Sequence, residues 1–166
     1  MRKIGLTGGI GSGKSMVARC LEVSGYPVFY SDAVAKSLME NDPSMRLALV
    51  DLFGLEAFTD VGLNRPYLAN CIFNDASLKE RLEALVHPKV RETFNQWSEN
   101  QKSALVFNEA AILFETAGEQ HLDEVWLVVS PIEVRLKRIA TRDGQPEDRI
   151  RERMNNQWPD ERKISL

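Results

Sequence analysis

A glycine-rich segment near the start of the chain constrains its fold more than any other feature. Residues 8–15 read Gly-Gly-Ile-Gly-Ser-Gly-Lys-Ser and satisfy the pattern G-x-x-x-x-G-K-[ST]. The apolar run Arg2–Leu6 precedes the segment and predicts a short buried strand, while Lys14–Ser24 carries the periodicity of a helix. The sequence therefore predicts a strand, a tight loop and a helix in direct succession.

This loop is typical of a site for the terminal phosphates of a nucleotide. Glycines let the backbone approach a ligand closely, and the helix that follows points its positive dipole end at the same anion. Lys14 would reach the β- and γ-phosphates, and the Ser15 hydroxyl would bind Mg²⁺. The residues expected to contact ATP are Gly8, Gly9, Ile10, Gly11, Ser12, Gly13, Lys14, Ser15 and Met16.

The rest of the pattern predicts a parallel sheet interrupted by a long helical stretch. Further strands are expected at Pro27–Tyr30, Ala104–Asn108 and Glu124–Val129, and the first of these completes a βαβ unit. Helices are expected at Ala33–Glu40, at Ser44–Phe53, from Asn64-Arg65-Pro66 onwards, at Ser77–Val86 and at Lys89–Gln101. His87-Pro88 predicts a break between the last two, because proline removes a backbone donor. We expect a three-layer α/β/α fold with a helical insertion.

The last third of the chain predicts two helices joined by a turn. Ser130-Pro131 is expected to open a helix to about Asp143, Asp143-Gly144 to form the turn, and Pro146 to open a charged helix ending near Gln157. We expect a core at about 1–32 and 103–137, an insert at about 33–102 and a lid at about 138–157. A sheet of this kind ordinarily has a fifth strand in addition to these four. We therefore expect a C-terminal strand and helix to be missing after Leu166.

Asp32 lies just past the end of the second predicted strand. Open parallel sheets bind ligands at the carboxyl ends of their strands, so this carboxylate could accept a proton from an attacking hydroxyl or hold a Mg²⁺-bound water. Aspartate is equally a favoured helix N-cap, here for a helix starting at Ala33. The sequence leaves both interpretations open.

Arginines recur in the two C-terminal helices. Arg135, Arg138 and Arg142 share one helix face, which suits a lid that closes on a triphosphate, and we favour that role for Arg138 and Arg142. The later arginines, at 149, 151 and 153, are flanked by acidic residues, which favours solvated ion pairs. His87, taken alone, is more often structural than a ligand contact.

Composition favours a soluble enzyme with a small-molecule substrate. The chain has 166 residues and a net charge of −3, which gives no bulk attraction for nucleic acid or an anionic membrane. Its apolar runs are shorter than the roughly 20 residues that span a bilayer, and no signal peptide is evident. Cys20 and Cys71 form no CxxC pair and are expected to be buried free thiols in a reducing cytosol. We expect a cytoplasmic monomer or weak homo-oligomer.

The order of these motifs resembles the dephospho-coenzyme A kinase family over nearly the whole chain. The matching stretches are Ile4–Ser15, Val28–Asp32, Leu63–Arg65, Ile72-Phe73, Leu85–Pro88, Ile112–Glu115 and Arg138–Asp143. The resemblance implies ATP-dependent phosphorylation of the ribose 3′-hydroxyl of dephospho-coenzyme A. It also implies catalytic roles for Asp32 as general base and for Lys14, Arg138 and Arg142, a metal contact from Ser15, and an acceptor pocket that includes Thr7, Asp32, Arg65 and His87.

The chain departs from the family pattern at three places. Tyr30 stands where a first aspartate is frequent, which puts a second carboxylate near Mg²⁺ in doubt, while Met16 and Ala111 replace a common threonine and proline. Two alternatives stay open. One is a kinase for another small acceptor, such as a nucleoside monophosphate or a sugar. The other is a nucleotide-dependent switch, although no apolar run ending in a metal-binding aspartate is evident on a later strand.

Overall fold

The computed structural model describes residues 1–166, and the chain divides into two compact units. The sheet unit comprises Met1–Tyr30 and Ser98–Leu166, and the helical unit comprises Ser31–Trp97. The helical unit is thus inserted in sequence between two parts of the sheet unit. Its acceptor-binding role, and the role of a lid within the sheet unit, stay predictions.

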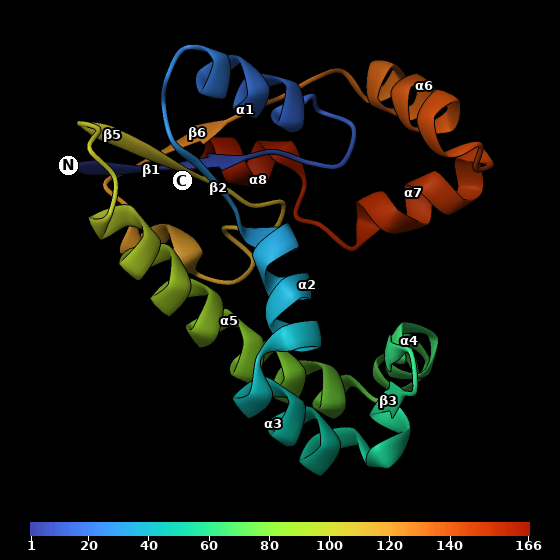
Figure 1. Cartoon of the computed structure of the whole chain (residues 1–166). Coiled ribbons are helices and arrows are strands. Elements are labelled where there is room, and N and C mark those ends of the chain that lie inside the picture. Colours follow the sequence, from blue (N-terminus) through green and yellow to red (C-terminus); the bar gives the residue numbers. More distant parts are fainter. The chain divides into compact units, whose positions relative to one another are not determined.

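The sheet unit is built on four parallel strands (Figure 1). They are β1 (Arg2–Thr7), β2 (Val28–Tyr30), β5 (Leu105–Glu109) and β6 (Glu124–Leu127), in the order β2-β5-β1-β6. All three pairings are parallel, so the four carboxyl ends lie at one edge of the sheet. The four predicted strands and the α/β fold class are confirmed.

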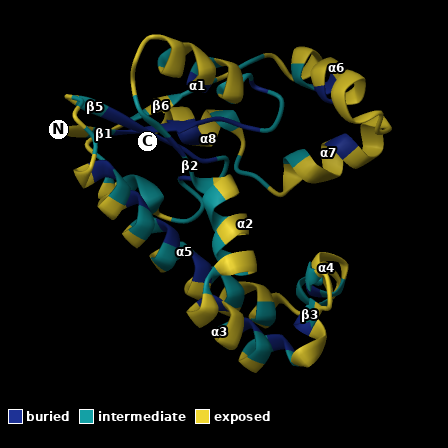
Figure 2. Cartoon of the chain, viewed as in Figure 1, coloured by how far each residue is buried: buried dark blue, intermediate teal, exposed yellow.

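The core of this unit lies along the two central strands. Ile4 and Leu6 of β1 and Val106 and Phe107 of β5 are at most 1% exposed, and Figure 2 shows both strands largely buried. Their near-continuous apolar sequence is typical of parallel strands that are covered on both faces. Helix α1 (Lys14–Val23) packs on β1, β2 and β5 and buries Ala18.

Two helices after β6 form a hairpin, here called the α6–α7 hairpin. Helix α6 (Ile132–Asp143) ends at Gly144, and α7 (Glu147–Asn155) follows, with Leu136, Ile139 and Ile150 buried between them. Pro131, rather than Ser130, occupies the N-cap of α6, so that helix begins one residue later than the capping prediction. A short helix that the sequence did not predict, α8 (Asp160–Ile164), ends the chain.

The helical unit consists mainly of four helices. These are α2 (Ser31–Asn41), α3 (Pro43–Phe53), α4 (Arg65–Asn74) and α5 (Ala76–Glu99). Side-chain caps start two of them: Asp42 accepts a bond from the Met45 N–H at 2.9 Å, and Asn64 from the Tyr67 N–H at 3.3 Å. The predicted glycine-containing loop carries a short 3₁₀ turn, η1 (Leu55–Ala57), and an antiparallel pair, β3 (Phe58–Thr59) with β4 (Gly62–Leu63).

The predicted break at His87-Pro88 is wrong. Helix α5 is continuous over 24 residues with Pro88 inside it. Val86, Val90, Phe94 and Ser98 recur every four residues along α5 and are all buried. This buried stripe crosses the proline, and its burial outweighs the single backbone hydrogen bond that Pro88 cannot make.

Two expectations about the surface have different outcomes. The cysteines are free, as expected, but Cys20 is exposed on α1 and Cys71 is only half-buried, so the prediction that both are buried is wrong. None of the helices has the combination of length and apolar sequence that crossing a bilayer requires.

Candidate active site

The glycine-rich loop joins the end of β1 to the start of α1. Gly13 is the N-cap of α1 with φ of 102°, a left-handed conformation that glycine adopts without strain. The first helical hydrogen bonds run from the Met16 and Val17 N–H groups to the Gly13 carbonyl, at 2.9 and 3.2 Å. The N–H groups of Gly13, Lys14 and Ser15 therefore precede the helical ladder and are available to an anion.

Lys14 forms a buried ion pair with Glu109, a residue that the sequence analysis missed. The side chains of Lys14 and Glu109 are 11% and 6% exposed. Glu109 ends β5, where it lies in register with Leu6 of β1 and Tyr30 of β2. A signal was present in the sequence, because β5 ends in this carboxylate, but a glutamate at the end of a strand does not match the aspartate of the common metal-binding pattern. The pair holds the Lys14 ammonium at the carboxyl edge of the sheet.

Tyr30 ends β2 beside this ion pair. Burial, a hydrogen bond to Glu22 and the negative charges of Glu22 and Glu109 raise the pKa of the Tyr30 phenol to about 12. The phenol is therefore neutral at physiological pH and supplies no second negative charge. Glu109 is the carboxylate beside it at this edge of the sheet.

The groups around the loop fit a nucleotide and a divalent cation. Free amides and the Lys14 ammonium suit phosphate oxygens, and the side chain of Ser15, an exposed residue, offers the hydroxyl oxygen that Mg²⁺ prefers. The hydroxyls of Thr7 and Ser12 are buried without a hydrogen-bond partner at the base of the loop. No group of three or more His, Cys, Asp or Glu side chains gathers around a point, so a Mg²⁺ ion here would depend on phosphate oxygens as ligands.

Arg138 lies against the carbonyl side of the loop. Its Nη1 donates to the carbonyls of Gly11 at 3.3 Å and Ser12 at 3.1 Å, and to Ser130 Oγ at 3.3 Å. The contact joins α6 directly to the phosphate loop. The structure therefore brings Arg138 together with the loop predicted to bind ATP, but through backbone carbonyl groups.

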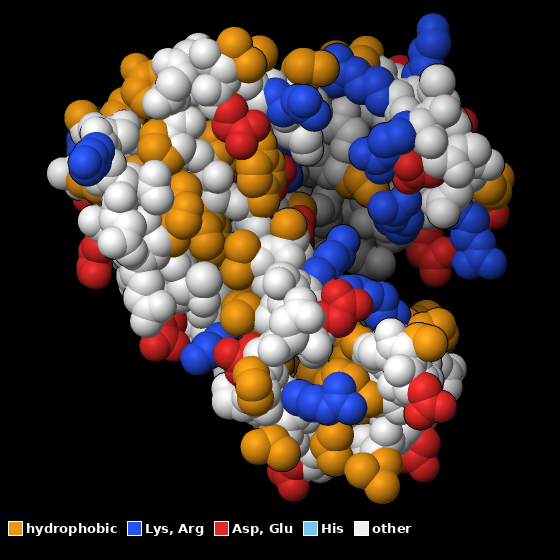
Figure 3. All heavy atoms as spheres, viewed as in Figure 1, with side chains coloured by type: hydrophobic (Ala, Val, Ile, Leu, Met, Phe, Trp, Pro, Cys, Tyr) orange, Lys and Arg blue, Asp and Glu red, His pale blue; other side chains and the backbone are white.

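Arg142 is held by the adjacent Asp143. Its Nε and Nη2 donate to the two carboxylate oxygens at 2.6 and 3.0 Å, and Arg153 donates to the same carboxylate at 3.0 Å. These hydrogen bonds, those from Arg142 above all, lower the pKa of Asp143 to about 2, and the pairing raises the pKa of Arg142. Lysine and arginine side chains gather over the α6–α7 hairpin in Figure 3.

The other arginines of α7 make ion pairs within the helix. Arg149 pairs with Glu152 at 3.2 Å, and Arg151 pairs with Glu147 at 2.7 Å. All four side chains are at least half exposed, so these pairs contribute little to stability. This confirms the interpretation of this stretch as a solvated, ion-paired face.

Three predicted site residues belong to the helical unit. Asp32 is exposed and lies in the first turn of α2, which begins at Ser31, so the interpretation of Asp32 as a helix cap is wrong. Arg65 opens α4 and pairs with Glu40 at 3.3 Å. His87 is half-buried on α5, and that burial lowers the pKa of its imidazole. Their roles in binding or catalysis stay predictions.

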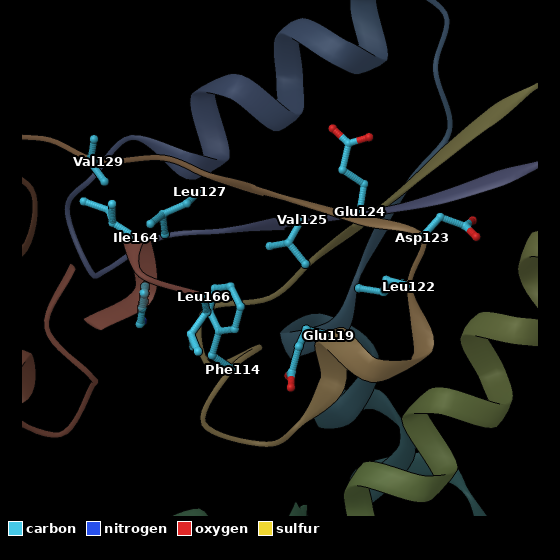
Figure 4. A pocket seen from close by; sticks show the side chains of 11 residues that line it. Phe114, Glu119, Leu122, Asp123, Glu124, Val125, Leu127, Val129, Ile164 and Leu166 are labelled. Atoms are coloured by element: carbon cyan, nitrogen blue, oxygen red, sulfur yellow. The ribbon is translucent and has the colours of Figure 1, made fainter. Parts of the chain in front are cut away.

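A cavity of about 540 Å³ lies elsewhere in the sheet unit, beside the edge strand β6. Figure 4 shows the apolar side chains of Leu122, Val125 and Leu127 lining it together with Phe114 and Ile164. No residue of the glycine-rich loop lines this cavity. It is therefore separate from the phosphate site.

The first strand of this parallel sheet leads through a glycine-rich loop into a helix that begins at Lys14. This arrangement defines a P-loop nucleotide-binding protein. The family model described as dephospho-CoA kinase matches residues 2–166. The chain therefore belongs to the dephospho-CoA kinase family, and it is a kinase of coenzyme A biosynthesis.

Individual relatives agree with this assignment. The chain is 39% identical over 162 residues to a dephospho-CoA kinase of Bacteroides fragilis, covering 97% of this chain and 79% of the relative. It is 41% identical over 165 residues to one from Salinibacter ruber, covering 97% and 83%. A crystal structure titled TT1252 from Thermus thermophilus superposes with a TM-score of 0.89 at 37% identity, covering 99% and 84%. A dephospho-CoA kinase from Campylobacter jejuni shares the fold, with a TM-score of 0.67 at 24% identity, covering 98% and 83%.

Proposed function

We propose that the chain transfers the γ-phosphoryl group of Mg²⁺-bound ATP to the 3′-hydroxyl of the ribose of dephospho-CoA, giving CoA and ADP. The observation that carries the ATP side is the start of α1, where the N–H groups of Gly13, Lys14 and Ser15 precede the first helical bond. The Gly8–Met16 segment would wrap the phosphates, with the Lys14 ammonium on the β- and γ-phosphates.

Electrostatic stabilisation is the main catalytic contribution in this proposal. The Ser15 hydroxyl would hold Mg²⁺, and the ion would supply positive charge beside the phosphates. Lys14 supplies a cation at the same place, and its ion pair with Glu109 keeps the ammonium at the loop before nucleotide binds. Arg138 and Arg142 of α6 would add positive charge during transfer, and Arg142 would then leave Asp143.

Asp32 is the proposed general base. It comes two residues after the end of β2, in the first turn of α2, and its side chain is exposed to an incoming substrate. In this role the carboxylate orients the 3′-hydroxyl of the ribose and accepts its proton as the phosphoryl group arrives. Thr7, Arg65 and His87 are proposed contacts of the acceptor.

The proposal sets the reaction in the cytoplasm, with small molecules as the partners of the chain. The chain would act as a monomer or a weak homo-oligomer, which sedimentation of the purified protein with and without substrates would test. A stable oligomer at micromolar concentration would contradict this part of the proposal and leave the reaction itself untouched.

An acceptor panel tests the reaction. ADP release from ATP is coupled to a spectroscopic readout, with dephospho-CoA, nucleoside monophosphates and simple sugars offered as acceptors. Dephospho-CoA is expected to be preferred by orders of magnitude in kcat/KM. Stable ATP occupancy without acceptor-dependent ADP release would instead favour a nucleotide-dependent switch, and preference for another acceptor would favour a different kinase.

Substitution of Asp32 tests the base. Asp32→Asn removes the proton acceptor while keeping size, so kcat should fall by about 10²–10⁴-fold, the usual contribution of general acid–base catalysis. The dissociation constant for ADP should change by less than about threefold, because hydrogen bonds to the phosphates are kept. Asp51→Asn, an exposed acid on α3, serves as the control. Near-normal turnover of Asp32→Asn would remove Asp32 from the mechanism.

A further inference from the structure

Ile10, at the tip of the phosphate loop, is held through both polar groups of its backbone. Its N–H donates to Gln157 Oε1 at 2.8 Å, and its carbonyl accepts from Arg135 Nε at 2.9 Å. Its side chain packs on the buried cluster of Leu136, Ile139 and Ile150 in the α6–α7 hairpin. Ile10 is therefore fixed by residues more than 120 positions away in the sequence.

The two residues that hold this peptide are themselves anchored. Arg135 Nη1 pairs with Asp160 of α8 at 3.0 Å, and both side chains are at most 15% exposed. Gln157 Nε2 also lies 3.5 Å from the carbonyl of Ala111. Arg135 and Gln157 are each held by a second contact outside the loop. Their hydrogen bonds to Ile10 therefore restrict the movement of the loop.

A buried carboxylate fixes the segment that follows Gln157. Glu115 Oε1 accepts from the Trp158 N–H at 2.9 Å and pairs with Lys163 Nζ at 2.8 Å, and the Lys163 side chain is 0% exposed. The guanidinium of Arg162 lies 3.2 Å from the centre of the Trp158 ring. Residues 157–163 are therefore tied to Glu115 at two points, and Gln157 links this segment to Ile10 of the loop.

Close packing of α6 against the loop adds to this restraint. A Cβ atom at Gly11, which has φ of +80°, would lie 2.9 Å from Ile139 Cδ1 and 3.0 Å from the Arg135 carbonyl. Only glycine lets the hairpin approach the loop so closely. The glycine at this position is thus required by the packing of the hairpin, in addition to any contact with phosphate.

We propose that Gln157 and Arg135 are positioning residues for the phosphate loop: they hold the Ile10 peptide by its N–H and its carbonyl, and so keep the loop in its nucleotide-binding shape before ATP arrives. Neither residue needs to contact the nucleotide. The proposal rests on the phosphate-binding role proposed above for Gly8–Met16. Without these two hydrogen bonds the loop would have to become ordered when the nucleotide binds. The free energy of that ordering would weaken nucleotide affinity.

Gln157 gives the sharpest test, because it holds Ile10 through a single atom, the side-chain oxygen Oε1. Gln157→Met keeps the length of the side chain and removes the acceptor, whereas Gln157→Glu keeps an oxygen that accepts from the Ile10 N–H. Asn155→Met, at an exposed position of α7, is the matched control. The measurements are the KM for ATP and for dephospho-CoA, kcat, the melting temperature, and hydrogen exchange of the Ile10 amide without nucleotide.

The proposal predicts a selective loss. Gln157→Met should raise the KM for ATP by about three- to tenfold, as expected for one hydrogen bond, with less than about twofold change in the KM for dephospho-CoA. The Ile10 amide should exchange faster by a similar factor. Gln157→Glu should restore the exchange rate of that amide, and Asn155→Met should resemble the wild type in every measurement.

Other results would overturn the proposal. An unchanged KM for ATP in Gln157→Met, or equal increases in both KM values with a lower melting temperature, would leave Gln157 a merely structural residue. If Gln157→Met fails to fold, Gln157→Asn, whose shorter side chain withdraws the oxygen from Ile10, is held to the same expectations. A wild-type protein that does not bind ADP would instead contradict the proposed function itself.

Discussion

The ion pair between Lys14 and Glu109 shows how one side chain can serve both the fold and the site. Each charge is almost completely removed from water, so each depends on the other for compensation. Lys14→Met leaves the Glu109 carboxylate buried without its partner and should lower the free energy of unfolding by about 3–5 kcal/mol. Urea unfolding of the purified variant measures this loss.

A double variant distinguishes the interaction between Lys14 and Glu109 from the separate contribution of each residue. Lys14→Met combined with Glu109→Gln removes both charges, so it should be more stable than Lys14→Met alone. Both variants should lose nucleotide affinity, because neither keeps the ammonium. If the double variant is as unstable as the sum of the single variants, the two side chains do not compensate each other.

His87 predicts a pH dependence of stability. Burial lowers its pKa in the folded state below the ordinary value of 6.5, so the unfolded chain binds the proton more tightly. The stability associated with the neutral imidazole is therefore fully present above pH 6.5 and is lost as the pH falls through the folded-state pKa. The melting temperature of the wild type should drop more between pH 8 and pH 5 than that of His87→Gln. Parallel curves would contradict a buried neutral imidazole.

Single residues were predictable where a motif fixes their position. The loop from Gly8 to Ser15 follows a pattern in which each position has a backbone or charge requirement, and the structure places it between β1 and α1. Glu109 and Gln157 were not predicted as site residues. Glu109 reaches Lys14 from 95 residues away and Gln157 reaches Ile10 from 147, so only the pairing of strands and the packing of the hairpin bring them there.

Helix α5 carries an interior proline at a structural cost that can be measured. Pro88 cannot donate the hydrogen bond that an ordinary residue would give to the preceding turn, yet the buried stripe from Val86 to Phe94 continues through it. Pro88→Ala should raise the free energy of unfolding by about 1–3 kcal/mol, since proline costs roughly 3 kcal/mol more than alanine inside a helix.

Denaturant unfolding of Pro88→Ala tests this expectation, with Ala84→Gly, at an exposed position one turn earlier, as a control expected to destabilise by about 1 kcal/mol. A less stable Pro88→Ala variant would show that the packing of α5 depends on the local geometry that proline imposes. In that case the interior proline contributes to the fold instead of weakening it.

Elements were predictable where their periodicity runs for several turns or their caps are explicit. The sequence places the start of α4 at Asn64 or Arg65, and Asn64 is the cap. The four apolar runs form the four parallel strands. The predicted break at Pro88 was wrong because it rested only on the local effect of proline. The buried residues on both sides of Pro88 keep the helix continuous. The two-residue strands β3 and β4, and the five-residue α8, are too short for periodicity to reveal.

At the scale of the whole molecule, the chain alternates between two kinds of structure. The sheet unit carries the phosphate loop, Glu109 and the arginines of the α6–α7 hairpin, and the helical unit carries Asp32, Arg65 and His87. The proposed function assigns the nucleotide to the first unit and the acceptor chiefly to the second, with Thr7 as an acceptor contact in the sheet unit. That assignment came from a family resemblance, because local sequence patterns do not tell which unit a substrate contacts.

Hydrogen exchange with each substrate alone tests this division. At about 100 times its dissociation constant a ligand stabilises the state it binds by about 2.7 kcal/mol, which slows exchange through opening of that state by roughly a hundredfold. ADP should protect amides in Gly8–Met16 and in the α6–α7 hairpin more than those in Ser31–Trp97. Dephospho-CoA should add protection within Ser31–Trp97, chiefly near Arg65 and His87.

Two variants make the exchange experiment decisive. Lys14→Met should lose most protection by ADP and keep protection by dephospho-CoA, because it removes a cation only from the phosphate site. Asp32→Asn should keep both, because a general base contributes to the reaction more than to binding of either substrate. If dephospho-CoA protects only the sheet unit, acceptor binding does not belong to the helical unit, and the roles proposed for Arg65 and His87 are wrong while the phosphate site stands.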